Sequence, residues 1–172
     1  MTDWIKAANP TAPITTEPEA LGAARASAIA IFIGFLTGAI GLIWQWLNPQ
    51  DIDAIVAQAG AADPQAASVA AASVQAGIWL GVALVAIQLI LGVVQWRSPN
   101  KILAILFIVL VAFGIVMTAA APLLAGMVPN VPATPGWQIA LSLVILAIQM
   151  ILLIAGLRGL NRLDAIQMNE SR

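Results

Sequence analysis

The sequence predicts an all-α integral membrane protein with four transmembrane helices in an antiparallel up-down bundle. Three observations lead to this fold class. Hydrophobic residues make up 61% of the chain and charged residues only 9%, whereas soluble domains are about 25% charged. The apolar residues gather in four long blocks instead of alternating with polar ones. All seven lysines and arginines fall on one side when these blocks are threaded through a bilayer.

The chain is short enough for one membrane domain, which we expect over residues 21–168. Residues 1–20 are polar and rich in proline, which predicts a flexible cytoplasmic tail without a core of its own. Residues 169–172 form a short C-terminal tail. The spans within the domain are expected at about 27–47, 76–96, 102–121 and 137–157.

The first apolar block, residues 27–47, has 21 residues and rises roughly 32 Å as a helix, which is enough to cross the hydrocarbon core. A cleaved signal peptide is the alternative reading. We favour a span because 26 residues precede the block and no small-residue cleavage site follows it.

The first outside loop, residues 48–73, contains its own helix signals. Asn48 and Pro49 form a typical helix start, and Ile52, Ile55 and Val56 follow at helical spacing. We therefore expect a short amphipathic helix in this loop. A second start signal at residues 63–65 suggests that the second helix begins well outside the membrane.

The later helices are bounded by proline and asparagine. Residues 98–101 predict a tight inside turn that caps the third helix, and Pro122 ends or kinks that helix. Residues 122–136 form the second outside loop. After the fourth span an apolar stripe continues through Leu160, Leu163 and Ile166, so we expect a helical extension there.

The cations predict the orientation. With the N-terminus inside, every cation is cytoplasmic, and both chain ends lie in the cytoplasm. The cations are Lys6, Arg25, Arg97, Lys101, Arg158, Arg162 and Arg172. The usage of much alanine and little lysine suggests a bacterium with a GC-rich genome, so the expected location is the bacterial cytoplasmic (inner) membrane.

Two glutamines lie near the middle of the predicted spans, Gln88 in the second and Gln149 in the fourth. A buried amide needs a partner, so each predicts either an interhelical hydrogen bond or a contact to a quinone, pigment or lipid headgroup. We favour the interhelical bond. A shift of 61 positions aligns both glutamines and the cations that follow them, which leaves an internal duplication open.

Two further sets of residues are candidates for contacts. Small residues at a spacing of four predict helix-packing faces, and cations at the inner ends of the helices predict a ring that touches anionic lipid. The packing faces are Gly34 with Gly38 and Gly77 with Gly81, and the cytoplasmic ring is Arg97, Lys101, Arg158 and Arg162.

The chain has no cysteine, histidine or tyrosine, and no charged residue lies inside a predicted span. These absences argue against an enzyme, a cofactor, a metal site or an ion-coupled carrier, and the net charge of −1 argues against nucleic-acid binding. We expect a non-catalytic membrane subunit, or an assembly or stabilising factor of a larger inner-membrane complex. Its partners would be membrane lipids and either other membrane subunits or copies of itself. The alternative is a small homo-oligomeric channel, carrier or lipid-handling protein.

Overall fold

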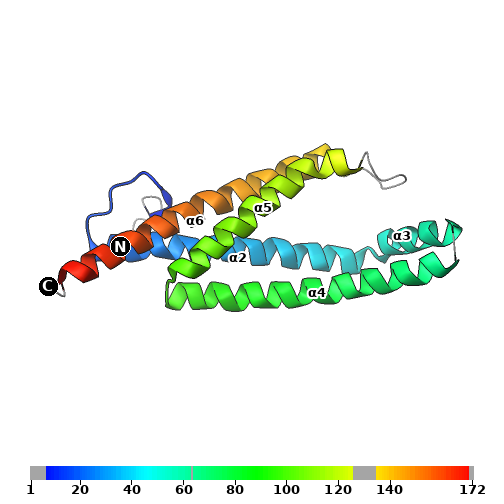
Figure 1. Ribbon diagram of the computed structural model, residues 1–172, viewed down its shortest axis with the longest axis horizontal. Helices are drawn as coiled ribbons and strands as arrows, with labels where there is room; N and C mark the ends of the chain where they lie inside the picture. The colour runs from blue at the N-terminus through cyan, green and yellow to red at the C-terminus, as the bar shows by residue number, and fades with distance from the viewer. Residues whose placement is uncertain (1–6, 63, 126–134, 171–172) are drawn as a thin grey trace. The chain divides into compact units, whose positions relative to one another are not determined.

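The computed structural model describes residues 7–62, 64–125 and 135–170 (Figure 1). Within these ranges it is helical, and no strand occurs there. The helices are α2 (Glu17–Leu47), α3 (Pro49–Ala62), α4 (Pro64–Arg97), α5 (Lys101–Ala125) and α6 (Gly136–Glu170). Most of the predicted outside loop 122–136 lies outside the described residues, as do Lys6, Asp63 and Arg172.

Four helices, α2, α4, α5 and α6, are long and apolar enough to cross a membrane. This agrees with the predicted all-α class and with a multi-pass membrane protein. Each helix extends beyond its predicted apolar span, because helix signals continue past the lipid-compatible block. The extension of α6 to Glu170 confirms the helical continuation expected after the fourth span.

The start of α2 lies inside the segment assigned to the N-terminal tail, at Glu17. The reason is a capping arrangement before the first helical turn. The Glu19 carboxylate accepts hydrogen bonds from the backbone N–H groups of Thr15 (2.9 Å) and Thr16 (3.3 Å), as in the second half of a capping box. Acidic residues in this first turn also complement the helix dipole.

The turn between α4 and α5 is capped as predicted. The Asn100 side-chain oxygen accepts a hydrogen bond from the Ile102 N–H at 2.7 Å, which satisfies one of the free donors at the start of α5. Pro122 lies within the last turn of α5, which continues to Ala125. Proline cannot donate the usual bond to the carbonyl four residues before it, but a kink so close to the helix end leaves the apolar span before Pro122 intact.

The chain divides into two compact units, residues 1–33 with 91–172 (unit 1) and residues 34–90 (unit 2). In unit 1 the α5 and α6 helices lie side by side (Figure 1). Their contacts pair Lys101 with Asp164 and Gly114 with Leu146, so the two helices run in opposite directions. The core of unit 1 combines α2, α5 and α6, and its main cluster is Ala30, Ile31, Phe107, Val111 and Leu153.

Candidate functional site

In unit 1, α2 and α6 approach each other closely at two glycines of α6. A Cβ atom added at Gly159 would lie 2.4 Å from the Ala24 backbone nitrogen, and one added at Gly156 would lie 2.5 Å from the Ser27 Cβ. Neither distance is sterically possible, so only glycine allows the two helices to approach this closely. The facing side of α2 consists of buried small residues, namely Ala20, Ala23, Ala24 and Ser27.

Ser27 also belongs to a buried hydrogen-bond network that joins α2 to the α4–α5 turn. Gln95 Nε2 donates to Ser27 Oγ at 2.8 Å and to the Asn100 carbonyl at 3.2 Å, and Gln95 Oε1 accepts from the Asn100 N–H at 3.0 Å. Ser27 Oγ in turn donates to the Ala24 carbonyl at 2.7 Å. Gln95 and Ser27 are both fully buried, so the network satisfies polar atoms that water does not reach.

Sequence reasoning missed Gln95, Gly156 and Gly159. Gln95 lies at a helix end beside Trp96, where an amide is ordinarily exposed, so its position in the sequence does not predict a buried contact. One signal was available for the glycines. The small residues Ala20, Ala23, Ala24, Ser27 and Ala28 share one helix face, and such a face allows close packing of a partner helix that is also lined by small residues.

Of the two predicted intramembrane glutamines, Gln149 makes an interhelical hydrogen bond. It is buried, and its Nε2 donates to the Ala30 carbonyl of α2 at 3.3 Å. Gln88 lies in unit 2, where its Oε1 is 3.9 Å from the position a Cβ would take at Gly38. Gln88 is thus placed against the small-residue face of α2 in its own unit.

The four predicted packing glycines have different surroundings. In unit 2 a Cβ at Gly38 would lie 2.9 Å from a Val85 methyl group, and one at Gly81 would lie 3.1 Å from Leu42. A Cβ at Gly77 would meet no described atom within 4 Å. Gly34 is half-buried, and its carbonyl accepts a hydrogen bond from Thr37 Oγ1 at 3.0 Å. Gly38 and Gly81 therefore pack within the unit, whereas Gly77 faces outward.

Three of the four residues of the predicted cationic ring contact other parts of unit 1 through their charged groups. Lys101 forms an ion pair with Asp164, which connects the start of α5 to the late part of α6. Arg158 donates from Nη1 to the Pro10 carbonyl, and Arg162 donates from Nε to the Ile14 carbonyl at 3.2 Å. Arg97 is exposed at the end of α4. The two arginines of α6 thus hold the segment before α2.

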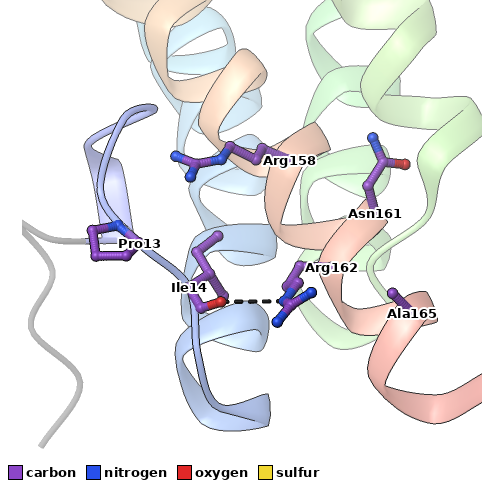
Figure 2. A pocket seen from close by; sticks show the side chains of 6 residues that line it. All are labelled: Pro13, Ile14, Arg158, Asn161, Arg162 and Ala165. Atoms are coloured by element: carbon purple, nitrogen blue, oxygen red, sulfur yellow. Dashed lines mark hydrogen bonds between the residues drawn. The ribbon is translucent and has the colours of Figure 1, made fainter. Parts of the chain in front are cut away.

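These contacts border an open cleft of about 480 Å³ (Figure 2). It lies between the segment before α2 and the late part of α6, and the side chains of Arg158 and Arg162 both line it (Figure 2). The remaining lining residues are Pro13, Ile14, Asn161 and Ala165. The cleft combines two guanidinium groups and one amide with an apolar wall, which is a suitable donor set for an anion.

The described residues contain no group of three or more acidic, histidine or cysteine side chains that could hold a metal ion. Comparisons with protein-family models, with curated proteins and with solved structures found no significant match for this chain.

Proposed function

We propose that this protein is a non-catalytic subunit, or an assembly or stabilising factor, of a larger complex in the bacterial inner membrane. In this proposal it acts by packing its helices against another membrane subunit. The observation that carries the proposal is the outward-facing small-residue surface of α4 at Gly77, in unit 2.

The surface at Gly77 carries small side chains, whereas helix surfaces that face lipid carry large aliphatic ones. Ser73, Gly77 and Gly81 share one side of α4 because they are spaced four residues apart. Leu42 of α2 covers Gly81, whereas Ser73 and Gly77 are exposed. Lipid tails contact large aliphatic side chains well, but a groove of small residues gives close van der Waals packing only to another helix.

Two features of unit 2 agree with a partner at this surface. Only 6% of the most apolar stretch of α4 is buried within the chain, which leaves most of that helix available. On α2, Gly41 is exposed and a Cβ placed there would contact none of the described atoms within 4 Å. In this unit α2 and α4 therefore each have a glycine that packs inside, Gly38 and Gly81, and a glycine that faces outward, Gly41 and Gly77.

The variant Gly77→Leu tests the proposal. Leucine fits at this open position, so the protein is expected to fold normally, whereas a partner helix loses its close approach. We expect co-purification of the partner to fall by roughly tenfold, equivalent to about 1.4 kcal/mol of binding free energy. Gly136→Leu is the matched control, because Gly136 is equally open but lies at the start of α6. If both variants retain partners as well as the unchanged protein does, the packing role of Gly77 is wrong.

The proposal includes an arrangement in the membrane. The four spans run up and down with both termini in the cytoplasm, and α3 is the short amphipathic helix of the first outside loop. The positions of the lysines and arginines support this orientation. The tryptophans at the predicted outer surface are largely exposed, which agrees with an interfacial belt. They are Trp44, Trp46, Trp79 and Trp137.

Because the chain has no cysteine, single cysteines can report this orientation directly. In intact cells, a membrane-impermeant maleimide is expected to label cysteine at Gln50 or Gly136, which lie in the two predicted outside loops. Cysteine at Ser98 or Gln167 should be labelled only after the membrane is permeabilised. Labelling of the Ser98 or Gln167 variants in intact cells would contradict the proposed orientation.

A further inference from the structure

The cleft of unit 1 lies between the segment before α2 and the late part of α6. Its two arginines play no part in the proposed packing of α4 against a partner helix. Arg158 and Arg162 are four residues apart on α6 and therefore lie on one face, roughly 6 Å apart along the axis. Each guanidinium has five N–H donors, and the described bonds to Pro10 and Ile14 use one donor of each. Most of the donors remain available to a ligand in the cleft.

The nearby carboxylates do not compete strongly for these donors. Asp164 is held by Lys101, and Glu19 accepts hydrogen bonds from Thr15 and Thr16 at the start of α2. The cleft therefore keeps a positive character. A planar guanidinium presents its donors as a fork, which matches the oxygens of a phosphate group better than an ammonium does.

The position of the cleft relative to the membrane, and its size, also indicate the kind of ligand. Arg158 immediately follows the predicted fourth span, which ends at about residue 157, so its charge lies at the level of lipid headgroups. The volume of about 480 Å³ is within the range of small-molecule sites and exceeds what a single water or halide ion needs. Pro13 and Ile14 add an apolar wall suited to the carbon atoms next to a phosphate (Figure 2).

We propose that this cleft is a phosphate-binding site, in which Arg158 and Arg162 hold the phosphate group and Asn161 donates an additional hydrogen bond. The phosphate is carried by an anionic phospholipid or by a soluble phosphate. The ordered segment before α2 forms the outer wall of the site, because the same two arginines hold its carbonyl groups.

The test uses the full-length protein, purified in detergent and stripped of lipid. Native mass spectrometry then measures the binding of added phosphatidylglycerol and phosphatidylcholine. Thermal melting compares the Tm of the protein in inorganic phosphate with its Tm in chloride at equal ionic strength. Selective, saturable binding of phosphatidylglycerol identifies the lipid as the source of the phosphate. Stabilisation by inorganic phosphate without lipid selectivity identifies a soluble phosphate.

Two pairs of variants localise the binding. Arg162→Gln is expected to weaken it about tenfold, and Arg172→Gln, which removes the same charge from the C-terminal end of the chain, should leave it unchanged. Because Arg162→Gln also releases the Ile14 carbonyl, Ala165→Glu provides a second variant that keeps this bond and places a carboxylate in the cleft. It should abolish binding, whereas Gln167→Glu, outside the lining, should not. Equal binding by all four variants, or no binding of either probe to the unchanged protein, would overturn the proposal.

Discussion

Replacing Gly159 by alanine is expected to separate α6 from α2 and to lower the free energy of unfolding by about 3 kcal/mol. The added methyl group would lie 2.4 Å from the Ala24 backbone nitrogen and 2.8 Å from the Ala20 carbonyl oxygen. Backbone atoms cannot rotate away as the end of a side chain can, so a whole helix has to move. For a chain of this size, the loss corresponds to a fall in Tm of roughly 10 °C, measurable by circular dichroism in detergent.

Gly114→Ala is the matched control for this prediction. A Cβ at Gly114 would be 3.5 Å from the nearest Leu146 side-chain atom, which is an ordinary van der Waals contact. The substitution makes the same chemical change in an apolar helix, and it gains up to about 1 kcal/mol of helix propensity. Its Tm should therefore stay the same or rise. Equal Tm values for the two variants would show that the close approach of α2 and α6 does not govern stability.

The second large effect is expected for Gln95→Leu. Leucine has a similar size but leaves the Asn100 N–H without its acceptor and removes the donor to Ser27 Oγ. The Ser27 hydroxyl is fully buried, and a buried polar group that loses its partner costs about 1–3 kcal/mol. The loss of the link between α2 and the α4–α5 turn adds to this cost. We expect the free energy of unfolding to fall by about 3 kcal/mol, with faster hydrogen exchange in the α4–α5 turn.

Gln149→Leu provides the comparison for Gln95→Leu. Gln149 is also buried, but its described interhelical bond is a single one of 3.3 Å to a carbonyl that belongs to α2. Such bonds average about 0.6 kcal/mol in membrane proteins, and leucine regains apolar packing. The loss should stay below about 1 kcal/mol. If Gln149→Leu proved the more damaging variant, the network around Gln95 would not be the main polar link in unit 1.

Much of the fold follows from sequence because the bilayer imposes strict physical rules. A span requires about 20 apolar residues, and the four blocks that meet this requirement all lie within long helices. The turn at Asn100 was predictable because a cap is a local feature. The early start of α2 was not predicted, because the prolines before it suggested a tail while the carboxylate of Glu19 stabilises a helix start.

The sites were harder to predict because they depend on contacts between distant parts of the chain. Gln95 and Ser27 are 68 residues apart, and nothing in either local pattern pairs them. Arg158 was predicted as a lipid-facing cation, but its bond to the Pro10 carbonyl uses a backbone group that every residue possesses. The prediction for Gln149 rests on a general rule, that an amide inside a helix bundle needs a hydrogen-bond partner, and Gln149 donates to the Ala30 carbonyl.

The most direct test of the proposed function is the native mass of the protein, expressed at its natural level and extracted into lipid nanodiscs. We predict a particle that contains at least one different membrane protein in fixed stoichiometry with this chain. Gly77→Leu should release this chain from the particle. A particle made only of copies of this chain, or a single copy with lipid alone, would contradict the role as a subunit or stabilising factor.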